Sequence, residues 1–186
     1  MRFVSITLAP PDIGEEIDAL RRPWNEAVGA QEALRYPPHL TLRTGLVCPD
    51  DQAAAAAATF LDHARSCRPA TLTTQGLFFT TYGEPGRQRG MVGWSVASSE
   101  SLWTLHQGLL EFKPWAKGPQ GEFRPHLTLA FDDLGPEGVE ILRQKARASG
   151  PVPDFSWTAD HVALYHETPE RWVEWGRVPL KADFGG

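Results

Sequence analysis

Hydrophobic and polar residues alternate along several short segments of the chain, and this period of two predicts β-strands. The predicted strands cover residues 3–9, 39–47, 71–80, 90–97, 123–131, 161–167 and 172–180. In longer segments the apolar residues recur every three or four positions, as they do on one face of a helix. The predicted helices cover residues 10–29, 49–67, 98–112 and 135–150. Strands and helices are therefore mixed along the whole chain.

Residues near the helix ends refine these boundaries. Asp50 or Asp51 can cap the alanine-rich second helix, because a carboxylate accepts hydrogen bonds from free backbone N–H groups. Ser98 or Ser99 can cap the third helix in the same way. Pro23 lies inside the first helix and is expected to interrupt or kink it.

The order of these elements is strand, helix, strand, helix, two strands, helix, strand, helix and two strands. Short, hairpin-like links and few long crossovers favour an α+β fold with mostly antiparallel sheets. No segment has the composition of a linker between independent domains, so we expect residues 1–186 to form a single domain. A weak likeness between the two halves of the chain suggests an internal duplication and no more.

Composition limits the classes of protein that the chain can represent. The 186 residues are 41% hydrophobic and carry a formal net charge of −5, so a globular domain is expected, whereas binding of long duplex nucleic acid is not. No apolar run is long enough to span a bilayer, so we expect no membrane insertion. Cys48 and Cys67 lack the spacing of a metal site and are expected to be reduced, partly buried thiols in a cytoplasmic protein.

The pentapeptide PHLTL occurs twice, at residues 38–42 and at residues 125–129. Each copy lies in a predicted strand, where successive side chains point to opposite faces. The histidine and the threonine of each copy therefore share one face, and the two leucines share the other. A strand face that only contacts solvent could carry other polar residues just as well. The repetition of the same histidine and threonine therefore needs a chemical explanation.

A symmetric site provides that explanation. If the two strands face each other across a groove, His39 and His126 meet there, each with a hydroxyl beside it from Thr41 or Thr128. A neutral imidazole can accept a proton while a charged one donates a proton, and threonine hydroxyls can hold phosphoryl oxygens. This equipment suits phosphodiester cleavage without a metal. A metal site is disfavoured, because neither motif has an adjacent Asp or Glu.

The doubled His-x-Thr-x pattern resembles the 2H phosphoesterase superfamily, which includes the 2′-5′ RNA ligase-like proteins and cyclic nucleotide phosphodiesterases. The segments GLFF…VGWSV and HVALYHE…RVPL are similar to the family's core strands, and the resemblance covers nearly the whole chain. It implies a bilobal fold with two sheets, helices on the outside and pseudo-twofold halves around a central cleft. It also implies that His39 and His126 are the catalytic pair and that Thr41 and Thr128 hold the phosphate.

The chain departs from this family at two places. Many bacterial RNA ligase-like members have an arginine just beyond the second motif, where this chain has Phe131. They also tend to have an aromatic residue after the first motif, where this chain has TLRTGL. The chain therefore resembles a divergent branch. The departures leave the chemistry unchanged and weaken the assignment of the substrate.

Four further residues are candidates for substrate binding. Arg43 and Arg124 share the strand parity of the motif histidines, so either can face the cleft and neutralise a phosphate. A solvated arginine at a strand end explains each of them equally well. Tyr82 and Tyr165 are the candidates for stacking on a nucleobase, although most aromatic residues of such a domain must lie in its core.

We therefore predict a metal-independent 2H-type phosphodiesterase that hydrolyses a 2′,3′-cyclic phosphate or a 2′-5′ linkage. RNA ends or small cyclic nucleotides are the expected ligands, and a monomer without a cofactor is the expected form. RNA joining is an alternative because it uses the same active-site chemistry, although the chain has no nucleotide-activating P-loop motif. A noncatalytic module that binds nucleotides or RNA is the other alternative.

Overall fold

The computed structural model describes residues 1–112 and 122–181. Within these ranges, the strands are β1 (Arg2–Leu8), β2 (His39–Val47), β3 (Ala70–Tyr82), β4 (Arg89–Val96), β5 (His126–Phe131), β6 (Ser156–Ala159), β7 (His161–Glu167) and β8 (Trp172–Pro179). The helices are α1 (Pro11–Val28), α2 (Ala53–Ala64), α3 (Glu100–Leu110) and α4 (Pro136–Ser149), with short 3-10 turns η1 (Glu32–Arg35) and η2 (Asp50–Gln52). None of these helices is long and apolar enough to cross a membrane.

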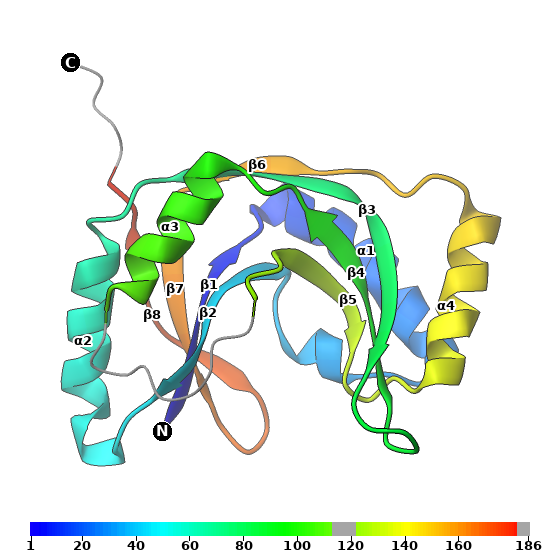
Figure 1. Cartoon of the computed structure of the whole chain (residues 1–186), viewed down its shortest axis with the longest axis horizontal. Coiled ribbons are helices and arrows are strands. Elements are labelled where there is room, and N and C mark those ends of the chain that lie inside the picture. Colours follow the sequence, from blue (N-terminus) through cyan, green and yellow to red (C-terminus); the bar gives the residue numbers. More distant parts are fainter. Residues whose placement is uncertain (113–121, 182–186) are drawn as a thin grey trace.

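The eight strands form one sheet in the order β6-β3-β4-β5-β2-β1-β7-β8, and every neighbouring pair is antiparallel. The predicted α+β class with antiparallel pairing is confirmed, and the two sheets that the sequence suggested are continuous with each other. At the centre, Leu40 on β2 pairs with Leu127 on β5. Beyond this point β2 and β5 diverge, so the sheet is arched (Figure 1).

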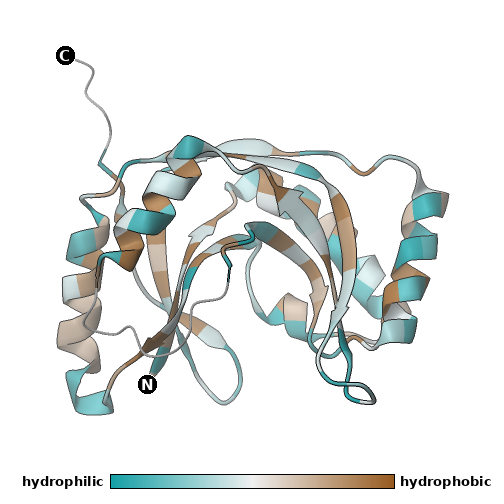
Figure 2. Cartoon of the chain, in the orientation of Figure 1, coloured by the Kyte–Doolittle hydropathy of each residue, from teal (hydrophilic) through white to brown (hydrophobic). Residues whose placement is uncertain are grey.

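Two pairs of helices cover different parts of the sheet. Helices α1 and α4 pack on β3, β4 and β5, whereas α2 packs on β7 and β8 and α3 packs on β2 and β3 (Figure 1). Figure 2 shows hydrophobic residues along the central strands and polar residues at the tip of the β3–β4 hairpin. The leucines of both motifs belong to the main core, where each is at most 1% exposed. The face of each motif strand that the alternation assigned to the core is therefore confirmed.

The structure tests three predictions about the helices: the caps of two of them and the effect of Pro23 on the first. Ser99 caps α3, because its hydroxyl accepts a hydrogen bond of 3.1 Å from the backbone N–H of Leu102. Helix α2 has no side-chain cap; Asp50 instead pairs with the amino group of Met1 at 2.6 Å. Helix α1 continues through Pro23, so the predicted interruption is wrong. Tertiary contacts along the rest of the helix outweigh the one backbone hydrogen bond that a proline removes.

The sequence did not predict β6, a four-residue strand whose residues pair with Ala70–Thr73 of β3. Such a short segment carries too few alternating positions to be recognised. Cys48 and Cys67 are separate, buried thiols, as expected.

Gly93 in β4 is required for close packing at the centre of the sheet, because a Cβ there would lie 2.2 Å from the carbonyl oxygen of Leu127. This glycine lets β4 approach the strand that carries His126.

Candidate active site

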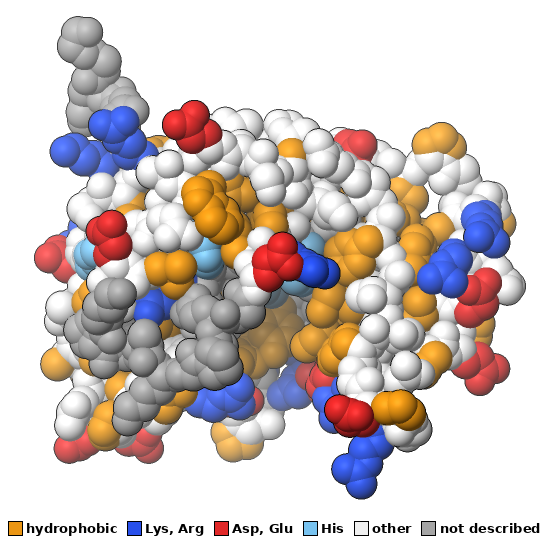
Figure 3. Space-filling model, viewed as in Figure 1, with side chains coloured by type: hydrophobic (Ala, Val, Ile, Leu, Met, Phe, Trp, Pro, Cys, Tyr) orange, Lys and Arg blue, Asp and Glu red, His pale blue; other side chains and the backbone are white. Residues whose placement is uncertain are grey.

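A cavity of about 350 Å³ lies where the two halves of the sheet meet. Figure 3 shows the molecule hollowed between its halves, with hydrophobic side chains inside and charged ones around the rim. His39 and Thr41 line the cavity from β2, and His126 and Thr128 line it from β5. The structure thus brings the two polar pairs of the repeated motif into one cavity, while the leucines of the same strands point into the core.

The register of β2 and β5 explains how the two motifs meet. Leu40 lies opposite Leu127 in an antiparallel pair. Side chains alternate along each strand, so the histidine and the threonine that flank each of these leucines lie on the opposite, cavity-facing side. The leucine pair therefore brings both His-x-Thr pairs to the same cavity.

Both imidazoles are oriented by the same backbone contact. Nδ1 of His39 lies 2.7 Å from the carbonyl oxygen of Pro37, and Nδ1 of His126 lies 2.8 Å from that of Arg124. A carbonyl oxygen only accepts hydrogen bonds, so Nδ1 carries the proton in both rings. Neither Nε2 atom has a hydrogen-bond partner in the described part of the chain. Both Nε2 atoms are therefore available for acid–base chemistry in the cavity.

The surroundings of His39 change the pKa of its imidazole. Burial lowers the pKa of His39 from 6.5 to about 4, and the hydrogen bond to Pro37 opposes this shift. The positive charges of Arg21 and His126 lower the pKa of His39 further. His39 is therefore neutral near neutral pH and can accept a proton at Nε2.

Aromatic side chains form part of the cavity wall. Tyr36, Phe131 and Trp172 line it. The ring of Tyr36 lies 5.8 Å from that of His39 and 6.1 Å from that of Trp172. Burial raises the pKa of Tyr36 to about 12, so its phenol stays protonated. A cavity with aromatic walls and polar groups at its base suits a ligand with a flat ring and an anionic group.

Arg21 also lines the cavity, and sequence reasoning missed it. Its guanidinium is only 4% exposed and pairs with Asp18 through Nε. Its Nη1 donates a hydrogen bond of 3.1 Å to the carbonyl oxygen of Ala33, and its Nη2 donates one of 2.6 Å to that of Tyr36. The signal was present in the sequence: Arg21 lies one helical turn after the buried Ile17, on the face of α1 that should be apolar.

Arg43 does not face the cavity, so this prediction is wrong. The pairing of β1 with β2 shifts register twice, with Ile6 opposite Thr41 but Ser5 opposite Arg43. Leu42 is the extra residue, and the resulting bulge turns both Leu42 and Arg43 toward the core. Arg43 is 2% exposed, and its Nη1 donates to the carbonyl oxygens of Leu109 and Phe112.

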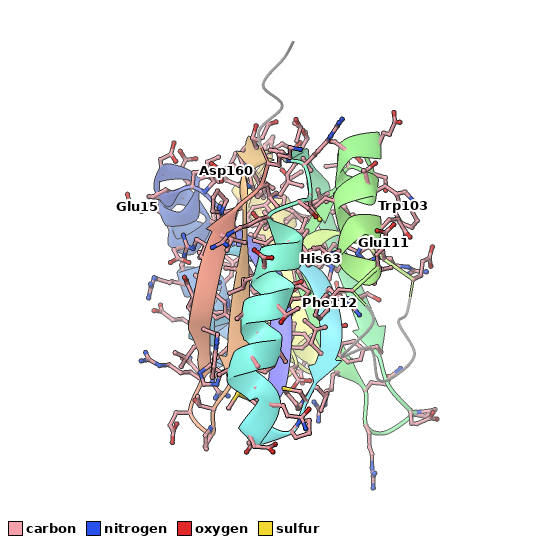
Figure 4. The ribbon with its side chains drawn as sticks, turned by 90° about the vertical axis from the view of Figure 1, so that its left-hand side faces the viewer. Glu15, His63, Trp103, Glu111, Phe112 and Asp160 are labelled. Carbon is pink, nitrogen blue, oxygen red and sulfur yellow. The ribbon has the colours of Figure 1, made fainter. Side chains whose placement is uncertain are left out.

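The residues around Arg43 belong to the helical layer on that side of the sheet. Phe112 follows α3 and lies beside α2, with its ring 5.5 Å from that of His63 (Figure 4). Burial lowers the pKa of Arg43, as desolvation of a cation does. Arg43 therefore ties β2 to the end of α3.

Arg124 also lies outside the cavity lining. Its side chain is exposed and pairs with Glu122 at 2.7 Å. Because β5 begins at His126, strand parity does not extend back to residue 124. Only the carbonyl group of Arg124 reaches the site, where it holds His126.

Neither candidate tyrosine lines the cavity. Tyr82 ends β3, and its hydroxyl donates a hydrogen bond of 3.2 Å to Asp132. Tyr165 is buried on β7, which β1 separates from β2, and its hydroxyl donates to Glu174 at 3.2 Å. The two tyrosines lie at different parts of the sheet, so the structure brings neither of them to the wall of this cavity.

A protein metal site needs several donor side chains in close array. Within residues 1–112 and 122–181, no three His, Cys, Asp or Glu side chains are grouped so that they can hold a metal ion.

Comparison with known proteins places the chain in context. The model of the 2′-5′ RNA ligase superfamily matches residues 9–170. No curated protein sequence matches the chain significantly. Among solved structures, the Thermus thermophilus protein TT0787 is 17% identical and superposes with a TM-score of 0.61, over 98% of this chain and 100% of that one.

Escherichia coli LigT in its apo form is 19% identical, with a TM-score of 0.63 over 97% of each chain. LigT complexed with 3′-AMP is 17% identical, with a TM-score of 0.56 over 96% of this chain and 97% of that one. At these identities the superpositions show a shared fold.

Proposed function

The chain belongs to the 2′-5′ RNA ligase superfamily, and we propose that it is a phosphodiesterase acting on a 2′,3′-cyclic phosphate or a 2′-5′ linkage. The substrate is the end of an RNA or a small nucleotide. One observation carries the proposal: both His-x-Thr pairs line one cavity, and both histidines have Nδ1 bound to a carbonyl and no partner for Nε2 among the described residues.

The proposed reaction uses the difference between the two histidines. Neutral His39 accepts a proton from water at Nε2 while the water oxygen attacks phosphorus. Protonated His126 donates its Nε2 proton to the ribose oxygen that leaves. One P–O bond forms and another breaks, so a phosphomonoester and a free ribose hydroxyl result. Proton exchange with solvent then returns His39 to its neutral form and His126 to its charged form.

The threonines stabilise the charge that develops on phosphorus. Thr41 and Thr128 line the same cavity from opposite strands. Their hydroxyls donate hydrogen bonds to the two non-bridging oxygens, which gain negative charge in the transition state. Because the hydroxyls are fixed on strands, they need little reorganisation during the reaction.

The cavity walls support a nucleotide as the substrate. The volume of about 350 Å³ lies in the range of sites for small ligands. Tyr36, Phe131 and Trp172 offer flat or apolar surfaces to a nucleobase. LigT, which shares this fold, has been solved with 3′-AMP, a ribonucleotide with a 3′-phosphate.

The test is incubation with the four 2′,3′-cyclic mononucleotides and with a short RNA that ends in a cyclic phosphate, with and without EDTA. We expect chromatography to resolve phosphomonoester products, in equal yield with EDTA. Adding an RNA with a free 5′-hydroxyl to the same assay detects joining, which would favour the ligase alternative. A cyclic nucleotide that binds and stays intact would contradict hydrolysis and indicate a binding module.

A further inference from the structure

Arg21 is a cation inside the cavity that the reaction described so far does not use. It lines the cavity from α1, and its side chain is only 4% exposed. Removing a guanidinium from water is costly unless partners compensate. Burial accordingly lowers the pKa of Arg21, and the carboxylate of Asp18 opposes this shift. Arg21 stays charged, because guanidinium groups do not lose their proton in proteins.

Arg21 has unused donors. A guanidinium has five N–H groups arranged as a planar fork. Three of them are used, by Asp18 at Nε, Ala33 at Nη1 and Tyr36 at Nη2. One N–H on Nη1 and one on Nη2 have no acceptor among the described residues. A pair of N–H groups on one fork matches two oxygens of a phosphate.

Arg21 does not have the carboxylate of Asp18 to itself. The carboxylate of Asp18 is shared, with Oδ1 on Arg21 and Oδ2 at 3.5 Å from Arg22. Two cations thus share one anion. Other arginines near the cavity have carboxylates of their own, such as Arg2, which lies 2.8 Å from Glu167. Asp18 therefore compensates the charge of Arg21 only in part.

The charge of Arg21 lies on the side of the cavity where His39 is held. Arg21 binds the carbonyl of Tyr36, and the ring of Tyr36 lies 5.8 Å from that of His39. Arg21 is also among the charges that act on His39. An anion bound to Arg21 would therefore be within reach of the imidazole.

We propose that Arg21 is the anion-binding residue of the cavity and that its two free N–H groups hold the phosphate group of substrate and product beside His39. This proposal rests on the proposed function and identifies the residue that recognises the phosphate. Its rival is a purely structural role, in which Arg21 only ties α1 to η1.

The test measures binding of inorganic phosphate, a nucleoside 2′-monophosphate and the matching nucleoside by calorimetry. Arg21→Met removes the charge, and Arg21→Lys keeps the charge but not the fork. Arg65→Gln is the matched control, because Arg65 is an exposed arginine that pairs with Asp62 and does not line the cavity. Circular dichroism and the Tm report whether each variant is folded.

We expect Arg21→Met to weaken binding of both phosphate ligands roughly 10- to 100-fold, with nucleoside affinity unchanged. Arg21→Lys should weaken phosphate binding at least about 3-fold, because an ammonium cannot bind two oxygens as a fork does. Arg65→Gln should change it less than about 2-fold. If Arg21→Met does not fold, Arg21→Lys decides the question.

Folded Arg21 variants that bind phosphate as tightly as the wild type would overturn the proposal, as would a wild type that binds no phosphate. Turnover of cyclic substrates by the wild type separates this result from the proposed function. If the wild type turns over and the Arg21 variants keep full phosphate affinity, only the role of Arg21 is rejected. If the wild type never consumes a cyclic phosphate, the hydrolytic function itself is rejected.

Discussion

Leu40 on β2 lies directly opposite Leu127 on β5, at the centre of the sheet. This pair joins the two copies of a pentapeptide whose histidines are 87 positions apart in the chain. Because leucine and histidine alternate on each strand, pairing the leucines in the core brings the histidines together in the cavity. The core contact and the site geometry therefore depend on each other.

Replacing either motif histidine should remove nearly all turnover. We expect His39→Ala and His126→Ala each to lower kcat at least about 10²- to 10⁴-fold, because each removes one partner of the acid–base pair. His166→Ala is the control, since His166 contacts Trp175 and Phe3 and does not line the cavity. Rates on a 2′,3′-cyclic mononucleotide measure the effect. Two folded motif variants with substantial activity would contradict the assignment.

The motif threonines should matter for the transition state. Thr41→Val and Thr128→Val keep the shape of the side chain and remove the hydroxyl. We expect each to lower kcat/KM about 10- to 100-fold, the effect of one hydrogen bond to a charged group. Thr41→Ser and Thr128→Ser keep the hydroxyl and should retain most of the wild-type rate. Valine variants as fast as the serine variants would show that the hydroxyls do not act on the phosphate.

His39 should make stability depend on pH below neutrality. The unfolded imidazole binds a proton near pH 6.5, whereas folded His39 stays neutral down to about pH 4. The unfolded state therefore binds more protons between these values, and the free energy of unfolding falls as the pH falls through this window.

Each unit of pKa difference corresponds to about 1.4 kcal/mol, so the loss should reach about 2 to 3 kcal/mol near pH 4. Urea denaturation at about pH 7 and about pH 4.5 measures it, and His39→Ala should lose less stability than the wild type over this interval. Equal losses in both proteins would exclude His39 as the cause.

Gly93 should tolerate no side chain. In Gly93→Ala the new Cβ would meet the carbonyl oxygen of Leu127 at 2.2 Å, so β4 and β5 must separate beside His126. We expect a loss of about 1 to 3 kcal/mol in the free energy of unfolding, with reduced turnover. Gly135→Ala is the matched control, because no atom lies within 4 Å of its added Cβ. Equal Tm values for the two variants would refute this packing argument.

Substitutions at Arg43 and Arg124 should distinguish a buried structural arginine from an exposed one. Arg43→Met leaves the carbonyl oxygens of Leu109 and Phe112 without their buried donor, so we expect a loss of about 2 to 4 kcal/mol in stability. Arg124→Met removes an exposed ion pair and should change stability by less than about 0.5 kcal/mol. Denaturant midpoints measure both. A large rise in KM for the folded Arg43→Met protein would reverse our assignment of Arg43 to the core.

Several features of this protein follow from its sequence alone. The period of two in PHLTL assigns the leucines to the core and His and Thr to the opposite face, and both assignments hold. The positions of the four helices and a serine cap at residue 98 or 99 also follow, because propensity and capping act within a few residues. The doubled motif identifies the family, and the match over residues 9–170 confirms it.

Only the tertiary structure decided which charged and aromatic side chains reach the cavity. Arg43 left the polar face because β2 bulges where it pairs with β1, and a bulge depends on the partner strand. Arg21 entered the cavity because α1 and η1 converge beside β5. Local patterns record the direction of a side chain relative to its own backbone. The neighbours that it meets depend on how distant segments pack, and no local period encodes that.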